Sequence, residues 1–456
     1  MLNSVMKQKQ IHLRRSSFMK VTKLLASLLF LSTTAFAQEQ VTLEKVIALA
    51  LEENYDVRLS KNASESATLV DETAWGAYLP TIDGNATTLW TNTPDQQLEF
   101  ADATRNQRGS VRSHATTASV QLNWILFDGT RMFATRERFA VLAAQGQLVV
   151  KDQMVNTIAS AINNYYDIVQ QKQQLSAIRE QMAVSEERVK LAERKLEVGT
   201  GRKPELLQAR VDYNAQRTQA FQKEAAIFQL KEQLNGLLGL KLPRQYDVAD
   251  TIMIDLNLQQ SQIEENIEQS NYALLATKKS IDVATLALRE SRAQRSPVIS
   301  FVSAYNYNRQ DNTKLLNPFG TIFSLNNGFN YGFTLSVPIL NGFNIRRQVE
   351  LSKIELDRQM ITYDQQKTVV DVGVRNAYVN YDNAKKVLQI EEETILLAKE
   401  NVFIALETFK RGVSTFIELR TAQQSLADAY TRLISARYLA KLAETELLRL
   451  NGSLLR

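Results

Sequence analysis

The chain has 456 residues and no cysteine. This absence excludes a disulfide, a metal–thiolate site, a thiol nucleophile and a lipid carried on a processed N-terminal cysteine. Only two histidines occur, His12 and His114, and neither belongs to a Ser-His-Asp arrangement or to a zinc-ligand spacing. A glycine-rich phosphate loop is also missing, so the sequence predicts neither an enzyme nor a bound metal or cofactor.

Proline is scarce, and none of the seven prolines lies inside a segment with a helical pattern. Proline breaks helices because it lacks a backbone N–H and clashes with the preceding turn. Its distribution therefore permits very long helices. After residue 37 there is also no apolar run of about 18 residues, the length of a membrane-spanning helix.

The first 37 residues have the pattern of a secretory signal peptide. Met19 is followed by two lysines, the apolar run Leu24–Leu31 and the small residues Ala35 and Ala37. We expect cleavage after Ala37, with Met1 or Met19 as the start. Without the six basic residues of this leader, 48 of the 54 basic residues remain against 49 acidic ones. A nucleic-acid partner is not expected from this near-neutral balance.

The remainder of the chain repeats itself once. Asn54-Tyr55 precedes a helical pattern and recurs 217 residues later, as Asn271-Tyr272. Three other matches share a spacing of 213 residues: Leu126–Gly129 with Ile339–Gly342, Val198-Gly199 with Arg411-Gly412, and Leu237–Gly239 with Leu450–Gly452. A single change of four residues in length explains both spacings, so we interpret the pattern as a duplication.

Each half is predicted to contain a helix, a β-hairpin, a very long helix, a tight turn and a last helix. In the first repeat (38–239) we place the hairpin at about 81–127 and the last two helices at about 130–198 and 204–238. We place a linker over 240–258, between the two repeats, and call it the equatorial region. In the second repeat (259–456) the corresponding elements are at about 298–340, 343–411 and 415–450.

The long helices carry an apolar residue at every seventh position. One stripe consists of Met154, Ala161, Ile168, Leu175, Met182, Val189 and Leu196, and the other of Val374, Tyr381, Leu388, Ile395, Val402 and Phe409. A seven-residue stripe of this length predicts left-handed supercoiling against neighbouring helices. Nearly seventy helical residues would extend on the order of 100 Å.

Alternation of apolar and polar residues predicts four strands of about 10–12 residues, the reach of a tilted strand in an outer membrane. The loops between paired strands are placed at Thr93–His114 and Gln310–Asn327. The aromatic residues expected to face lipid are Trp124, Phe301, Tyr305, Tyr307, Phe329, Tyr331 and Phe333. An amphipathic sheet that covers a soluble core is the alternative interpretation.

Four strands cannot close a membrane barrel, and lipid does not tolerate open sheet edges. Several chains must then pool their strands, and three chains would supply twelve, an even number within the usual range of about 8–26. The predicted fold is therefore mixed: a membrane β-barrel that continues into an α-helical barrel, mainly α, in a homotrimer that contacts outer-membrane lipid.

The duplicated halves, paired strands, very long helices and glycine turns together resemble the TolC-like outer membrane efflux protein family, the outer membrane factors. The segment Leu43–Asn54 is similar to the usual first helix of the family, L-x-x-A-I-x-x-A-L-x-x-N, and Ala209-Arg210 and Ala422-Gln423 also fit. The resemblance covers essentially the whole mature chain.

This resemblance implies a passive exit duct across the periplasm and outer membrane of a Gram-negative bacterium. The trimer would form a twelve-stranded barrel above a twelve-helix tunnel, in a tripartite efflux or type I secretion system. Its partners would be a periplasmic adaptor (membrane fusion) protein and an inner-membrane transporter of the RND, ABC or MFS type. No cofactor is implied.

The resemblance also assigns roles to residues near the two helix–helix turns. The adaptor would contact Val198, Gly199, Thr200, Gly201, Arg411, Gly412, Val413 and Ser414. Glu205 and Glu418, with Thr421, would form the pore constriction. The alternatives are that both turn glycines only end helices and that Glu418 only caps one, with Thr415. Phe409 takes the place of a tyrosine that locks the gate in some relatives.

A structural surface protein is the main alternative of another class, namely a trimeric coiled-coil stalk like that of an adhesin. A stalk would pass once along its axis, whereas this chain is predicted to fold back in two hairpins. A periplasmic adaptor would need β-rich lipoyl-like halves around one helical hairpin. The sequence lacks that arrangement.

Overall fold

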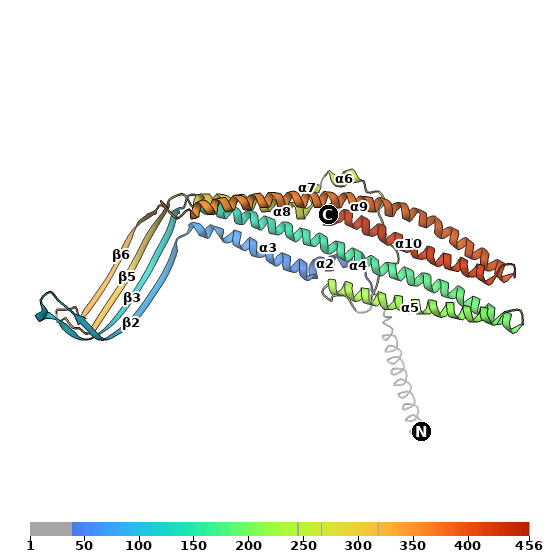
Figure 1. Ribbon diagram of the computed structural model, residues 1–456, viewed down its shortest axis with the longest axis horizontal. Coiled ribbons are helices and arrows are strands. Elements are labelled where there is room, and N and C mark those ends of the chain that lie inside the picture. Colours follow the sequence, from blue (N-terminus) through green and yellow to red (C-terminus); the bar gives the residue numbers. More distant parts are fainter. Residues whose placement is uncertain (1–38, 244–245, 266, 318, 456) are drawn as a thin grey trace, which may run out of the picture.

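The computed structural model describes residues 39–243, 246–265, 267–317 and 319–455, and it is elongated. Helices form the longer part of the molecule, and a β-sheet forms one of its two ends (Figure 1). The predicted signal peptide lies outside the described residues. No helix among these residues is both long enough and apolar enough to cross a membrane.

The elements follow the same order in both halves of the chain. The helices are α2 (Leu43–Glu53), α3 (Tyr55–Thr73), α4 (Arg131–Glu197), α5 (Lys203–Leu237), α6 (Gln260–Glu264), α7 (Ile267–Ser270), α8 (Tyr272–Ala293), α9 (Asn344–Lys410) and α10 (Phe416–Leu450). The strands are β1 (Glu39–Gln40), β2 (Thr81–Leu98), β3 (Gln107–Phe127), β4 (Tyr246–Asp247), β5 (Val298–Lys314) and β6 (Phe323–Ser336).

The helical segment before each hairpin is interrupted, where the sequence analysis expected one helix. Asn54 has an extended backbone (ψ 130°), and its side-chain oxygen accepts hydrogen bonds from the N–H groups of Asp56 and Val57. This caps a new helix. In the second half Asn271 caps α8 in the same way, through the N–H of Leu274. The two asparagines also donate to the carbonyls of Leu237 and Leu450, so both repeats share this contact.

The strands are longer than predicted. They contain 18, 21, 17 and 14 residues in β2, β3, β5 and β6. Much of the predicted loops Thr93–His114 and Gln310–Asn327 is therefore strand. Polar side chains continue the pairing there, as in the Arg108–Asp95 ion pair at 2.7 Å. The second hairpin ends earlier than 340, at Ser336, because Pro338 has no N–H to donate to a ladder.

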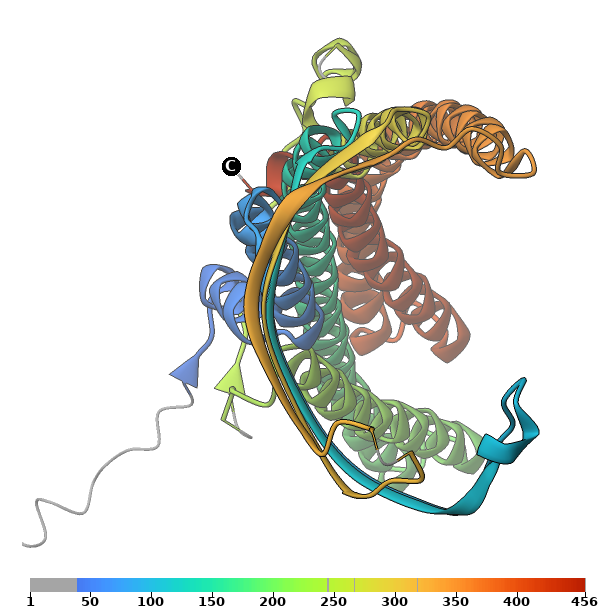
Figure 2. The same ribbon diagram turned by 90° about the vertical axis from the view of Figure 1, so that its left-hand side faces the viewer.

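The four long strands form one antiparallel sheet in the order β2-β3-β5-β6. The hairpins of the two repeats meet at β3 and β5, where Trp124 pairs with Phe301. Within the described residues, β2 and β6 each have an outer edge without a strand partner. Viewed along the molecule, the sheet is a curved wall, and the long helices curve to the same side (Figure 2).

The long helices pack as two antiparallel hairpins, α4 with α5 and α9 with α10, and α10 lies against α4. The predicted seven-residue stripe on α9 is confirmed, because all six of its residues are buried: Val374, Tyr381, Leu388, Ile395, Val402 and Phe409. The stripe on α4 is buried at Ala161, Ile168 and Leu175 and half-buried at its other positions. Such narrow buried stripes are expected where the helices form a single layer.

The segment between the repeats wraps the middle of the helical region. β4 pairs in parallel with β1. Two buried tyrosines hold the segment on the helices: the hydroxyl of Tyr165 accepts from the N–H of Ala249 at 3.0 Å, and that of Tyr381 donates to the carbonyl of Asp255 at 2.8 Å. These tyrosines extend from α4 and α9, so the linker fixes both repeats at their equator.

Candidate functional site

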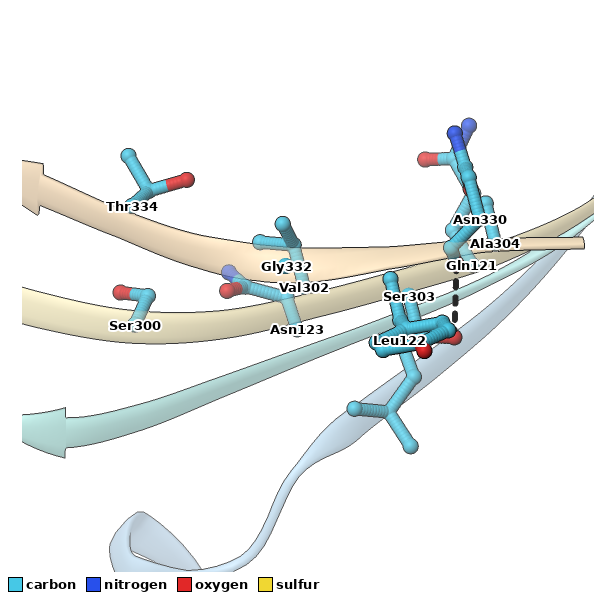
Figure 3. Close-up of a pocket in the computed structure, with 11 residues that line it drawn as sticks. Gln121, Leu122, Asn123, Ser300, Val302, Ser303, Ala304, Asn330, Gly332 and Thr334 are labelled. Atoms are coloured by element: carbon cyan, nitrogen blue, oxygen red, sulfur yellow. Dashed lines mark hydrogen bonds between the residues drawn. The ribbon is translucent and has the colours of Figure 1, made fainter.

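The two faces of the sheet differ in chemistry. A hollow of about 650 Å³ lies on the concave face and is lined by Gln121, Asn123, Ser300, Asn330, Thr334 and their neighbours. In Figure 3 the side chains of Gln121 and Asn330 point to one side of the sheet and that of Leu122 to the other. Hydroxyl and amide groups, together with the small apolar residues Val302 and Ala304, thus line the inside of the curve. A water-filled passage requires such a surface.

The convex face carries the aromatic residues that the sequence analysis assigned to lipid. The strand register aligns Trp124, Phe301 and Phe333 in one row and Tyr305 with Phe329 in another. Phe329 is 66% exposed and Phe333 74% exposed. Tyr307 and Tyr331 share this face by alternation. A large apolar surface on a polypeptide marks a surface that contacts lipid or another protein.

The two helix–helix turns lie at the end of the molecule opposite the sheet (Figure 1). Gly199 and Gly412 each have φ +77°, a left-handed conformation that glycine adopts without steric cost. The N–H groups of the following residues then return to the last helical turn, from Thr200 to the carbonyl of Lys195 and from Val413 to that of Thr408. Both turns therefore have one geometry.

Each turn presents one apolar side chain to solvent. Val198 is 77% exposed and Val413 is 79% exposed. The other residues assigned to the turns, Thr200, Gly201, Arg411 and Ser414, surround them. A small apolar tip with a polar rim is the composition of many protein-binding surfaces.

The proposed constriction residues lie in the first turns of α5 and α10. Glu418 and Thr415 form a capping box, in which the hydroxyl of Thr415 accepts from the N–H of Glu418 and the carboxylate of Glu418 accepts from the N–H of Thr415. The hydroxyl of Thr421 donates to the carbonyl of Ile417. Glu205 is the third residue of α5 and follows Pro204. No hydrogen bond or ion pair between described residues joins Glu205 to Glu418.

Phe409 contacts α4 through its ring. It is 7% exposed, and the Nζ of Lys195 lies 4.1 Å from the ring centroid. A cation–π contact therefore joins the ends of α4 and α9, although Phe409 has no hydroxyl. The seven-residue stripe predicted that Phe409 is buried, but nothing in the sequence identified Lys195 as its partner.

An ionic cluster that the sequence analysis missed joins three helices near the turns. Arg188 of α4, whose side chain is 2% exposed, donates to Asp212 of α5 at 2.7 Å and to Gln423 of α10 at 2.9 Å. Arg420 of α10 also reaches Asp212, at 3.1 Å. Burial lowers the pKa of Arg188, and the charge of Asp212 opposes that effect. Asp212 is the anion that lets Arg188 stay buried.

A groove of about 500 Å³ lies beside this cluster, between α4, α9 and α10. Its apolar lining includes Val184, Leu191, Leu406, Phe409 and Leu419, and its charged residues are Glu187, Arg188, Arg194 and Lys410. Further from the turns, the hydroxyl of Tyr430 on α10 donates to Glu180 on α4 at 2.7 Å. The two helical hairpins therefore contact each other through charged and polar side chains. Single substitutions can change each of these contacts.

Among the described residues, no group of three or more His, Asp or Glu side chains could hold a metal ion. The chemical features of the molecule are instead those of surfaces: a polar concave face, an apolar convex face and two exposed turns.

A family model described as outer membrane efflux protein matches residues 46–240 and 264–453. The outer membrane efflux protein BepC of Brucella suis is 24% identical over 96% of this chain and 92% of its own length. The outer membrane protein TolC of Vibrio cholerae is 23% identical over 69% of this chain and 70% of its own. Among solved structures, the outer membrane channel CmeC of Campylobacter jejuni superposes with a TM-score of 0.75 at 17% identity, covering 90% of this chain and 85% of that one.

Proposed function

The chain belongs to the outer membrane efflux protein family, and on this premise we propose that it is one subunit of a passive homotrimeric exit duct. The duct would cross the periplasm and the outer membrane of a Gram-negative cell, without a lipid anchor. An inner-membrane transporter of the RND, ABC or MFS type would supply the energy, through a periplasmic adaptor, in a tripartite efflux or type I secretion system.

The observation that carries this proposal is the opposite chemistry of the two faces of one curved sheet with open edges. Three copies joined through β2 and β6 would place twelve strands in a cylinder, apolar outside and polar inside. The helices continue the curve, and the 67 residues of α4 extend about 100 Å from the sheet. A single-pass coiled-coil stalk would have no such polar inner face.

Purified protein reconstituted into planar lipid bilayers tests the proposal. Discrete conductance steps are expected, together with trimers on chemical crosslinking in detergent. A protein that stays monomeric and water-soluble without detergent, and that produces no steps, would contradict it.

We further propose that Val198 and Val413 contact the adaptor. Replacing both with aspartate is expected to lower adaptor affinity by about tenfold or more, because two exposed apolar contacts are replaced by charges. Binding is measured by titration with the purified adaptor. The control is Met253→Asp, which changes an equally exposed residue (73%) in the linker. An equal loss of adaptor affinity in the control variant would show that the adaptor contact is not specific to Val198 and Val413. An unchanged affinity in the double variant would contradict the proposal as well.

Glu205 and Glu418 are proposed to narrow the pore as rings of carboxylates in the trimer. The double variant E205Q/E418Q is then expected to reduce the ratio of cation to anion permeability by about twofold or more, because negative charge is removed from the constriction. Reversal potentials in a salt gradient measure this ratio. Glu350→Gln, near the start of α9, serves as the control. Unchanged selectivity in the double variant would leave helix capping as the role of Glu418.

A further inference from the structure

The convex face of the sheet changes from apolar to charged toward its outer end. Along β3 one face carries Trp124, Leu122, Val120 and Ala118, and then Thr116, His114, Arg112 and Ser110. The neighbouring strand β5 changes at the same level, from Tyr305 and Tyr307 to Arg309 and Asp311. The boundary therefore lies at the same level on the two neighbouring strands β3 and β5, whereas Leu325 and Phe323 of β6 keep exposed apolar side chains at that level.

Aromatic side chains mark both limits of the apolar band. The indole of Trp124 donates to the carbonyl of Tyr78, close to the helices. At the outer limit, Trp90 of β2 stacks on His114 with ring centroids 4.8 Å apart and is 72% exposed. Trp124 and His114 are ten residues apart on β3. At a strand tilt of about 40°, ten residues rise about 25 Å, the height of an outer-membrane apolar band.

Two cations lie immediately beyond this outer limit. Arg112 and Lys314 are cross-strand partners in the register of β3 and β5. The Nζ of Lys314 donates to the hydroxyl of Ser110, which shares the convex face with Arg112. Both cations are exposed. They lie about 5 Å further out than His114, at the level expected for lipid headgroups.

These two charges have no anion of their own. Arg112 bonds to the amide oxygen of Asn92 and Lys314 to a hydroxyl, and among the described residues neither forms an ion pair. The nearby cations differ, since Arg309 is paired with Asp311 at 2.8 Å and Arg108 with Asp95 at 2.7 Å. Like charges directly opposite each other destabilise a strand pair, so an added anion between them would be favourable.

We infer that Arg112 and Lys314 bind the phosphate group of a phosphorylated lipid in the outer leaflet. The acyl chains would lie on the apolar band below, beside Trp90. An anion bound to a guanidinium and an ammonium receives charge-assisted hydrogen bonds, and the chains add apolar contact. His114 does not contact the lipid phosphate through Nε2, because that atom is inaccessible to solvent; its ring positions Trp90. This inference rests on the proposed outer-membrane function.

The test uses the full-length trimer in detergent and measures retained lipid by native mass spectrometry. We expect phosphatidic acid, which carries a phosphate monoester, to bind at least about tenfold more tightly than phosphatidylcholine, a difference of about 1.4 kcal/mol. The variant R112Q/K314Q is expected to lose this preference. Arg108→Gln, which removes a cation already paired with Asp95, is expected to keep it. A double variant that keeps the preference would overturn the inference.

Two further measurements complete the test of this lipid site. The charge-conserving variant R112K/K314R is expected to retain the preference for phosphatidic acid. This control is independent of the stability of the glutamine variant. Loss of the preference in R112K/K314R would contradict a charge-based site. Inorganic phosphate at millimolar concentration is expected to compete poorly, because it lacks acyl chains; effective competition would indicate a free-anion site and reject the lipid. Channel steps with no lipid preference would reject only this inference, whereas the absence of steps would reject the proposed function.

Discussion

Replacing Asp212 with alanine is expected to loosen the contact between the two helical hairpins near the turns. The change leaves the guanidinium of Arg188, whose side chain is 2% exposed, without its carboxylate. Removing one partner of a buried ion pair costs about 3–5 kcal/mol, because the remaining charge stays desolvated. The cost here should lie at the low end, since Gln423 still accepts from Arg188 and the ring of Phe416 lies 5.1 Å away.

Hydrogen exchange of α4, α5 and α10 near the turns measures this effect locally, and single-channel recording measures its consequence for the duct. We expect faster exchange there, and a conductance that is larger or fluctuates more, because α10 is held less firmly. The matched control is Glu224→Ala. It breaks the Arg179–Glu224 pair between the same helices, α4 and α5, but both of its side chains are exposed (62% and 45%). Such a pair contributes about 0–1 kcal/mol. If both variants behave alike, Asp212 does not hold the hairpins together.

Replacing Gly129 with alanine is expected to prevent assembly of the folded protein at growth temperature. Gly129 links β3 to α4 with φ +74°. A Cβ atom placed there would lie 2.4 Å from the Cβ of Ser296 and 2.6 Å from the carbonyl oxygen of Ala293, so the backbone would have to move. A left-handed non-glycine residue costs about 1–3 kcal/mol, and overpacking adds about 1–3 kcal/mol. The yield of folded protein in purified outer membranes reports the loss.

The duplication supplies the control for this variant. Gly342 holds the equivalent position in the second repeat, also with a positive φ of +61°, but an added Cβ would meet no atom closer than 4.0 Å. Gly342→Ala should therefore cost only the conformational part, about 1–3 kcal/mol, and should yield more folded protein. Equal yields for the two variants would show that the close approach to α8 does not matter.

The sequence predicted the order of the elements because their signals are local and periodic. A polar–apolar alternation determines which strand residues share a face, and the seven-residue spacing of Val374 to Phe409 determines the buried side of α9. The glycines of the two turns were also predictable, since few other residues adopt positive φ without strain. The strand ends were predicted less well, because pairing between polar residues such as Asp95 and Arg108 depends on the partner strand.

The ionic cluster at Asp212 could not be predicted for the same reason. The residues of the cluster are far apart in the sequence: Asp212 lies 24 residues from Arg188 and 208 residues from Arg420. From its local sequence, each would be predicted to be a charged residue on a solvated helix face. Burial of Arg188 depends on how α5 and α10 cross α4, which no local pattern specifies. The cross-strand neighbours Arg112 and Lys314, from different repeats, became partners only through the register of β3 and β5.

The type of each element and the position of its apolar face were therefore predictable from the residues alone, because both depend on periodicity within one segment. Which charges are paired, buried or left without an anion became known from the folded chain. Those outcomes depend on atoms brought within about 4 Å from distant parts of the chain, where the electrostatic energy is largest.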